Sequence, residues 1–506
     1  MSSNLSWILV MFILITVGES KGRVDSECNP KDLMGLAGFK AGIRIDTSGR
    51  LAKWTGHSCC KWEGISCSNQ TGRVTEIQLP GFISTDDSIL QTKMEGLVSP
   101  SITLLTFLEV IDLGGLIGIA GTIPPLIGFH LPKLQKLYLY GNNLSGPVPE
   151  SIGKLSRLKE ICLHENSLSG SLPFGLGRLQ NLNRLLLYSN RFSGPIPESF
   201  TNLTSLVNLD LHSNSLTGHI PEKIGALQVL EMLDLSDNLL SGTLPFSLTN
   251  LTAISVLYLD TNLLEGKIQF PSSSNQMTSL GFLRLHDNRL TGRIPPGLGN
   301  LASLQRLSLA NNRLEGAIPS TLGNLSALTE IYLNGNRLSG QIPKSIGQLS
   351  RLIFLSISHN LIEGPLPHEM SSLQNLQTID LSFNRLRLSS IPKWLAGLPS
   401  LCKIFMAGCG IQGEFPGFLR TTPSPLLELD LSANYLTGSI PTWFGSLSQL
   451  YSLNLSRNLL VSQIPDTITN LDDLGVLDLH SNQLTGPVNQ VLQDWEQVQR
   501  RVTNIH

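Results

Sequence analysis

A repeat of 24 residues runs through most of this 506-residue chain and constrains its fold more than any other feature. Segment 131–154 has the sequence LPKLQKLYLYGNNLSGPVPESIGK, and segments 155–178 and 179–202 repeat its pattern of Leu, Asn, Gly and Pro. A period of this length is interpreted before local secondary structure, because it predicts a stack of similar units. One unit cannot bury its apolar face alone, whereas a stack of units shares a continuous core.

Each unit combines a strand, a buried polar residue and a turn. Leu137 and Leu139 alternate with polar or aromatic neighbours, which is the period-two pattern of a half-buried strand. A buried Asn142 side chain can bond backbone groups that the following turn leaves unpaired, so its equivalents form a ladder. Gly146 and Pro149 then turn the chain back. This ladder position is Asn at 142, 166, 190, 214, 238, 262, 288, 312, 336, 360, 384, 434, 458 and 482, with Gly118 and Cys409 in two further units.

The pattern LxxLxLxxNxLxGxIPxxIGx resembles the leucine-rich repeat, and its LxGxIP half resembles the plant extracellular subclass. The resemblance implies an α/β solenoid, a plant-type superhelix with a parallel β-sheet on the concave face and 3₁₀ turns on the convex face. We expect the repeats to occupy residues 70–487. They form about 17 units, which at roughly 4.8 Å per strand span an arc of about 80 Å.

The N-terminal residues predict export and a capped solenoid. Residues 1–20 have a short apolar core followed by small residues, Gly18 and Ser20, which predicts a signal peptide. Four of the seven cysteines cluster before the repeats, and in a secreted protein such a cluster predicts two disulfides. Segment 27–68 resembles the N-terminal cap of plant leucine-rich repeat proteins, and this resemblance implies the pairs Cys28–Cys59 and Cys60–Cys67. A cap of this kind covers the apolar end of the first repeat.

Other features also favour a location outside the cell, either secreted, in the cell wall or at the outer face of the plasma membrane. No apolar run of 18 residues follows the signal peptide, so we expect no membrane span in this chain. Residues 488–506 depart from the repeat, and we expect a C-terminal tail or an incomplete cap there. Several glycosylated sequons, mostly away from the strand face, are expected among Asn69, Asn143, Asn202, Asn250, Asn324 and Asn454.

The chain offers no convincing catalytic, metal or cofactor motif. Its net charge is −2 and no basic stripe is present, which argues against nucleic acid as a partner. Residues 408–413 match GxGxxG, the dinucleotide-binding pattern. This pattern needs a helix directly after it to hold a pyrophosphate, and Pro416 and Gly417 argue against a helix there. Cys409 instead falls on the ladder position and is expected to be a buried thiol, while Cys162 is expected to be a free thiol. We therefore expect no catalytic residues, no metal and no cofactor.

The remaining candidates for function face out of the predicted sheet, at two, four and six residues before each ladder position. Five of the seven tyrosines fall in these three columns, and Tyr is a frequent interface anchor because its rigid face ends in a polar tip. Histidines and arginines accompany them, whereas later units carry mainly serine there. We call this set the concave stripe and expect it to bind a ligand: Lys136, Tyr138, Tyr140, His164, Arg184, Tyr188, Asp210, His212, Tyr258, Asp260, Arg284, His286, Arg306 and Tyr332.

The leading hypothesis is a recognition protein without catalysis that binds a protein or peptide ligand through the concave stripe, in signalling or defence. The partner is expected to be a peptide, a receptor-kinase co-receptor or a pathogen enzyme. The similarity to polygalacturonase inhibitors leaves inhibition of a microbial wall-degrading enzyme as an alternative. A third hypothesis, an enzyme or a DNA-damage-tolerance factor, follows from the resemblance to damage-toleration-like proteins. The signal peptide, the cap cysteines and the lack of a catalytic motif argue against it.

Overall fold

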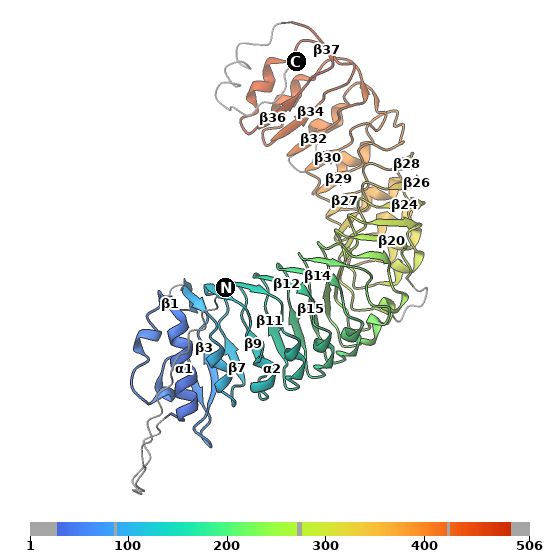
Figure 1. Cartoon of the computed structure of the whole chain (residues 1–506). Coiled ribbons are helices and arrows are strands. Elements are labelled where there is room, and N and C mark those ends of the chain that lie inside the picture. The colour runs from blue at the N-terminus through green and yellow to red at the C-terminus, as the bar shows by residue number, and fades with distance from the viewer. Residues whose placement is uncertain (1–27, 85–88, 271–275, 422–425, 487–506) are drawn as a thin grey trace, which may run out of the picture.

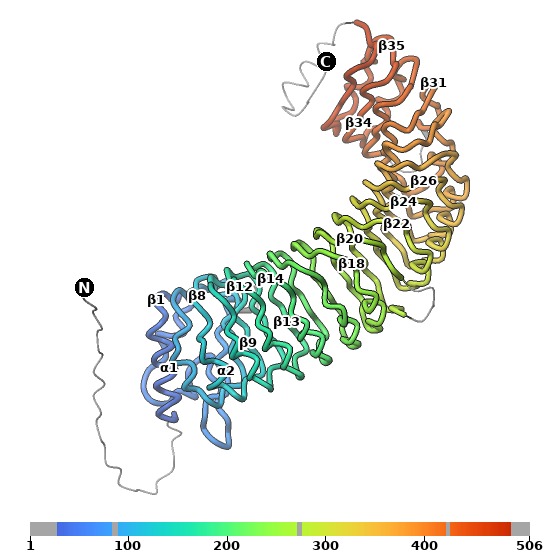
Figure 2. Tube along the Cα trace, turned by 45° about the vertical axis from the view of Figure 1, so that its right-hand side comes forward, coloured from blue at the N-terminus to red at the C-terminus, as the bar shows by residue number. Residues whose placement is uncertain are grey.

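The chain forms one continuous solenoid that curves into an open arc (Figures 1 and 2). The computed structural model describes residues 28–84, 89–270, 276–421 and 426–486. Successive units lie side by side along the arc, so distance along the sequence becomes distance along the solenoid. The expected signal peptide and C-terminal tail lie outside the described residues.

Seventeen parallel strands of the described residues form the main sheet on the concave face. An antiparallel strand, β2 (Ile65–Cys67), extends the sheet at its first edge. The parallel strands are β3 (Val74–Gln78), β7 (Val110–Asp112), β9 (Lys136–Tyr138), β11 (Glu160–Cys162), β13 (Arg184–Leu186), β15 (Asn208–Asp210), β17 (Met232–Asp234), β19 (Val256–Tyr258), β21 (Phe282–Arg284), β23 (Arg306–Ser308), β25 (Glu330–Tyr332), β27 (Phe354–Ser356), β29 (Thr378–Asp380), β30 (Lys403–Phe405), β32 (Glu428–Asp430), β34 (Ser452–Asn454) and β36 (Val476–Asp478).

Most strands of a second set follow the ladder positions, and this set is interrupted along the arc. Its first sheet contains β1 (Ile43–Asp46), β6 (Met94–Leu97), β8 (Ile117–Gly121), β10 (Asn143–Gly146), β12 (Ser167–Ser171), β14 (Arg191–Pro195) and β16 (Ser215–Thr217). The next contains β18 (Ser241–Thr243), β20 (Leu263–Lys267), β22 (Arg289–Gly292), β24 (Arg313–Gly316), β26 (Arg337–Gln341) and β28 (Leu361–Glu363). Short pairs follow: β31 (Gln412–Gly413) with β33 (Tyr435–Leu436), and β35 (Val461–Ser462) with β37 (Gln483–Leu484). Two further strands, β4 (Phe82–Ser84) and β5 (Ile89–Gln91), pair antiparallel with each other.

Helical turns complete most units, and the only long helix of the described chain belongs to the cap. This helix, α1 (Pro30–Gly42), starts with Pro30 after Asn29, whose side chain accepts a hydrogen bond from the Lys31 amide. The others are α2 (Ile127–His130) and the 3₁₀ helices η1 (Leu51–Lys53), η2 (Cys59–Lys61), η3 (Pro100–Leu104), η4 (Glu150–Lys154), η5 (Phe174–Arg178), η6 (Glu198–Asn202), η7 (Ile224–Ala226), η8 (Phe246–Asn250), η9 (Pro296–Asn300), η10 (Ser320–Asn324), η11 (Lys344–Gln348), η12 (His368–Ser372), η13 (Lys393–Gly397), η14 (Gly417–Thr421), η15 (Thr442–Ser446) and η16 (Asp466–Asn470).

The ladder asparagines stabilise the turns as the sequence predicts. Asn312 is 8% exposed, and its Nδ2 donates to the carbonyls of Leu285, Leu309 and Ala310 at 2.9, 3.2 and 3.0 Å. Its Oδ1 accepts the amide of Leu290 in the preceding unit at 2.9 Å. One side chain therefore satisfies backbone groups in two units, which holds neighbouring turns in register.

The N-terminal cap confirms both disulfides, Cys28–Cys59 and Cys60–Cys67. Trp54 is buried and stacks on Trp62 with ring centroids 5.2 Å apart, so both belong to the cap core. An ion pair that the sequence did not reveal joins the cap to the first strand. The fully buried Asp32 accepts from Arg73 Nε and Nη2 at 2.8 and 2.7 Å and from the Val74 amide at 2.9 Å.

The surface groups agree with most of the sequence expectations. Asn69, Asn143, Asn202, Asn250 and Asn324 are exposed, whereas Asn454 is half-buried on β34 and accepts a hydrogen bond from Ser456. Their glycosylation stays a prediction. Cys162 and Cys409 are buried free thiols, and Cys402 is free and half-buried. Within the described ranges, none of the helices combines the length and the apolar character that a bilayer crossing requires.

Candidate functional site

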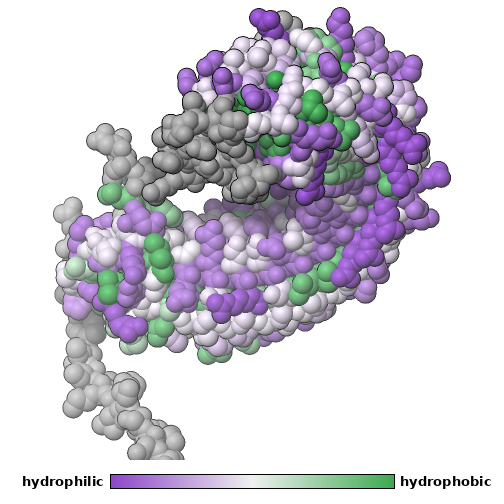
Figure 3. Space-filling view, turned by 90° about the horizontal axis from the view of Figure 1, so that it is seen from above, coloured by the Kyte–Doolittle hydropathy of each residue, from purple (hydrophilic) through white to green (hydrophobic). Residues whose placement is uncertain are grey.

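The concave stripe lies on one face of the main sheet, inside the hydrophilic hollow of the arc (Figure 3). Its members occupy β9 to β25 or the two residues after each strand, because alternate residues of a strand point to the same side. All are partly or fully exposed except Asp210 and Asp260, which are only 5% and 8% exposed. The expected residues therefore form one continuous surface, in which two of the carboxylates are buried.

Four rings of this stripe stack into one column, which we call the ring ladder: Tyr140, His164, Tyr188 and His212. The centroids of successive rings are 4.8, 4.3 and 4.5 Å apart, and the angles between their planes are 7°, 17° and 10°. These distances are close to the spacing of neighbouring strands, so equivalent positions in four units stack without bending the sheet. Gly114 occupies the next position, where a Cβ atom would lie 2.2 Å from the Tyr140 ring.

Stacking determines what the ring ladder can offer to a ligand. The ring faces inside the column cover each other, so the ring edges and the tyrosine hydroxyls remain for contact. Of the imidazole nitrogens, His164 Nδ1 is buried and His212 Nδ1 is hydrogen-bonded to Asp210. Burial raises the pKa of Tyr188 to about 12 and also raises the pKa of Tyr140, so both hydroxyls keep their protons as potential donors. Burial lowers the pKa of His164, whereas a 2.7 Å hydrogen bond to Asp210 raises the pKa of His212. The ring ladder is thus a preformed row of polar groups.

Two glutamates that the sequence analysis missed hold the flanking side chains of the concave stripe. Glu160 accepts the Tyr138 hydroxyl at 2.8 Å and pairs with Lys136 and Arg184, each at 3.3 Å. Although burial opposes it, the hydrogen bond from Tyr138 and the charge of Lys136 lower the pKa of Glu160.

The same arrangement recurs further along the sheet. Glu330 accepts the Tyr332 hydroxyl at 2.8 Å and Arg306 Nε at 2.7 Å. The signal for both glutamates was present in the sequence at a spacing of 24 residues. Glu160 lies between Lys136 and Arg184 at this spacing, and Glu330 follows Arg306 at the same spacing.

The middle of the stripe combines acidic and basic groups. The Arg284 guanidinium lies 4.2 Å from the centre of the Tyr258 ring, a cation–π contact that fixes both side chains. His286 Nε2 lies 3.4 Å from Asp260 Oδ2. Potential ligand atoms of Asp210, His212 and Asp234 lie within 4.8 Å of one another, and a metal ion would find one imidazole and two carboxylates there. The hydrogen bond between Asp210 and His212 already satisfies part of this group.

Comparison with known proteins identifies the family. A model of a leucine-rich repeat N-terminal domain matches residues 29–68, a leucine-rich repeat region matches 277–494, and single repeats match 133–155, 181–203, 205–227 and 229–251. A solved structure of the peptide hormone receptor RGFR1 in complex with RGF2 is 33% identical, with a TM-score of 0.73, and the alignment covers 84% of this chain and 72% of that one. The chain belongs to the plant extracellular leucine-rich repeat proteins.

Further relatives support the same family at different lengths. The structure of PEPR1 with AtPEP1 is 31% identical, with a TM-score of 0.81, over 92% of this chain and 63% of that one. The DNA damage-repair/toleration protein DRT100 of Arabidopsis thaliana is 38% identical over 23% of this chain and 32% of its own length. Phytosulfokine receptor 1 of the same plant is 34% identical over 29% of this chain and 14% of its own length. The chain therefore aligns with a third or less of these two curated relatives.

Proposed function

We propose that this leucine-rich repeat protein is a non-catalytic extracellular receptor component that binds a peptide ligand along the concave stripe. The observation that supports the proposal most directly is the ring ladder. Its rings are locked by stacking before any ligand arrives, so binding costs little side-chain entropy. The row of hydroxyl and imidazole edges offers hydrogen-bonding groups to an extended peptide backbone.

Charged groups elsewhere in the concave stripe supply the specificity of this site. Arg184 and Arg306 are each held by a glutamate, so their remaining guanidinium N–H groups are presented in fixed positions. Solved relatives support a peptide in particular, since PEPR1 and RGFR1 were determined with AtPEP1 and RGF2, respectively. An extracellular location agrees with the disulfide-bonded cap.

Affinity selection tests the proposal. The purified full-length chain is immobilised and exposed to a phage-displayed library of random peptides, and the enriched peptides are then titrated against variants. Replacement of Tyr140, Tyr188 and Tyr258 by alanine is expected to abolish binding of the enriched peptides. The control variants Tyr435→Ala and Tyr451→Ala each remove an exposed tyrosine outside the concave stripe and should bind normally.

Two outcomes would contradict this proposed function. One is retention of peptide binding by the triple alanine variant while it remains folded. The other is equal loss in the triple variant and in the Tyr435→Ala control, which would indicate non-specific adhesion to tyrosine.

A further inference from the structure

The second set of strands is interrupted at the unit of Asn384. From β18 to β28 each strand pairs with the next, but β28 meets its successor only through one bridge, Glu363 with Arg385, before β31 resumes the pattern. The sequence RLRLSSIP explains the interruption, because Leu388 stands where neighbouring units have the turn glycine, as at Gly340. Arg387 instead adopts a φ of 48°, a left-handed conformation that arginine rarely takes.

The ladder position of the following unit contributes to the same interruption. In regular units the ladder Asn accepts the amide of the preceding unit, as Asn384 does from Ile362 at 3.0 Å. Cys409 donates weakly to the carbonyls of Leu381 and Ala407 but offers no such acceptor. The Leu386 amide is consequently left without a hydrogen-bond acceptor among the described residues. A backbone donor without a partner is uncommon in native structures and marks a place where a ligand atom can bind.

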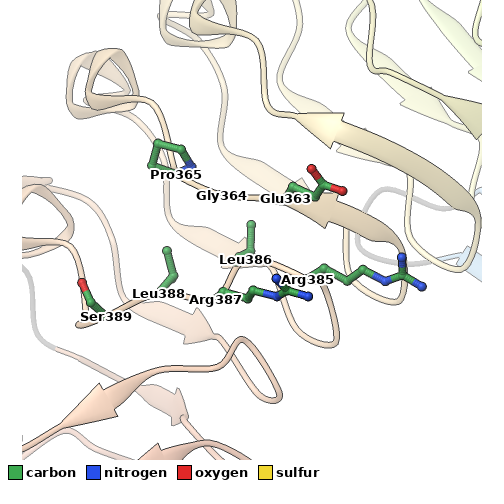
Figure 4. A pocket seen from close by; sticks show the side chains of 8 residues that line it. All are labelled: Glu363, Gly364, Pro365, Arg385, Leu386, Arg387, Leu388 and Ser389. Atoms are coloured by element: carbon green, nitrogen blue, oxygen red, sulfur yellow. The ribbon is translucent and has the colours of Figure 1, made fainter.

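A groove of about 550 Å³ opens at this place (Figure 4). Gly364 and Pro365 form one wall, and residues 386–389 form the other. Figure 4 shows the Arg385 and Arg387 side chains extending to the same side of the ribbon. Both arginines are exposed, and neither forms an ion pair or hydrogen bond through its guanidinium with a described residue.

Of the two arginines of the groove, Arg385 lies opposite an acidic residue, Glu363, whereas Arg387 does not. In the neighbouring units each exposed arginine after the ladder position lies opposite a glutamate or a polar residue: Arg289 opposite Glu265, Arg313 opposite Thr291, Arg337 opposite Glu315 and Arg385 opposite Glu363. Arg387 occupies the position that Glu315 and Glu363 hold in their units, and its backbone packs against Gly410. In this column glutamates alternate with Thr291 and Ser339, and Arg387 brings a positive charge into it, opposite a glycine.

From these observations we propose that the groove binds an acidic segment of a partner polypeptide. Arg387 is the main anchor of a carboxylate, Arg385 assists it, and the Leu386 amide supplies a further donor. Guanidinium groups match carboxylates in geometry and charge. A repeating polyanion such as an acidic polysaccharide would need several uncompensated cations in a row, whereas glutamates lie opposite Arg289, Arg337 and Arg385 on this face. The site lies outside the concave stripe and does not depend on the proposed function of that stripe.

Titration with a defined probe tests this proposal. A fluorescent synthetic peptide of alternating Glu and Gly is titrated against the full-length chain, with the Gln–Gly peptide as the uncharged control. We expect the Glu–Gly peptide to bind saturably and the Gln–Gly peptide not to bind. Arg387→Gln should weaken binding of the Glu–Gly peptide by about tenfold, the loss of one charge-assisted hydrogen bond. Arg313→Gln removes the same charge from a neighbouring exposed position and should change the affinity by less than about twofold.

A second variant tests the part played by the backbone. Cys409→Asn supplies the missing ladder acceptor, so its side-chain oxygen should accept the Leu386 amide. The variant should therefore bind the Glu–Gly peptide more weakly, although no charge has been removed. The triple alanine variant of the concave stripe should bind the Glu peptide normally, which separates this site from the concave one. Equal effects of Arg387→Gln and Arg313→Gln, undiminished binding by Cys409→Asn, or tighter binding of a uronic-acid oligosaccharide than of the peptide would each overturn the proposal.

Discussion

Replacing one ladder asparagine provides a quantitative test of how the solenoid is held together. Asn312→Ala removes three donated hydrogen bonds and one accepted bond, and it leaves the Leu290 amide buried without an acceptor. An unsatisfied buried amide costs about 1–3 kcal/mol, and the carbonyls that lose a shared donor add about 1 kcal/mol together. We therefore expect a local destabilisation of about 2–4 kcal/mol.

Hydrogen exchange is the appropriate assay, because a solenoid need not unfold in one step and the effect is concentrated in neighbouring units. At about tenfold per 1.4 kcal/mol, the amides of β22 and β24 should exchange about 30- to 800-fold faster in Asn312→Ala. Amides of the cap should be unchanged. Asn375→Ala is the matched control, since this exposed asparagine donates only one bond, to the Ser350 carbonyl. Similar protection in the two variants would refute the account of the ladder.

Three further predictions concern single groups. The hydrogen bond to Asp210 raises the folded pKa of His212 above the unfolded value of 6.5, so its contribution to stability is complete below 6.5 and is lost as the pH rises through the folded pKa. Urea denaturation should accordingly find His212→Asn more destabilised near about pH 5 than near about pH 8, and a pH-independent difference would contradict this. Removing Cys28–Cys59, whose residues are 31 apart, should destabilise the cap by about 4 kcal/mol against about 2 kcal/mol for Cys60–Cys67, 7 apart, as limited proteolysis of the double-alanine variants can measure. Burial raises the pKa of Cys162 to about 12, so alkylation at about pH 8 should label it at least about a thousandfold more slowly than after denaturation, and rapid native labelling would contradict its burial.

The sequence was sufficient to predict the fold because its information is repeated. The ladder asparagine and the leucine positions recur in most units, so one interpretation applied to all of them. The structure confirms the sheet, the cap disulfides and the buried Cys409. The positions of the stripe residues on one face followed from the same period. Their role in binding stays a proposal.

Contacts between units were harder to foresee. Glu160 and Glu330 each lie six residues before a ladder asparagine. Only the packing of the side chains shows that they bind the hydroxyls of Tyr138 and Tyr332. The sequence showed that the four residues of the ring ladder lie at equivalent positions of successive units. It did not show that their ring faces stack on each other, because stacking depends on the side-chain rotamers. The interruption at Arg387 depends on an absent acceptor in the next unit, which the repeat pattern conceals.

The most direct test of the central claim compares two substitutions at one ring of the ladder. Tyr188→Phe keeps the stack with His164 and His212 but removes the hydroxyl, whereas Tyr188→Ala removes both. The affinity of a peptide enriched on the wild-type chain is measured by calorimetry for both variants. We predict that Tyr188→Phe weakens binding by about tenfold, the cost of one hydrogen bond, and that Tyr188→Ala weakens it considerably more. Unchanged affinity in both folded variants would contradict ligand binding by the concave stripe.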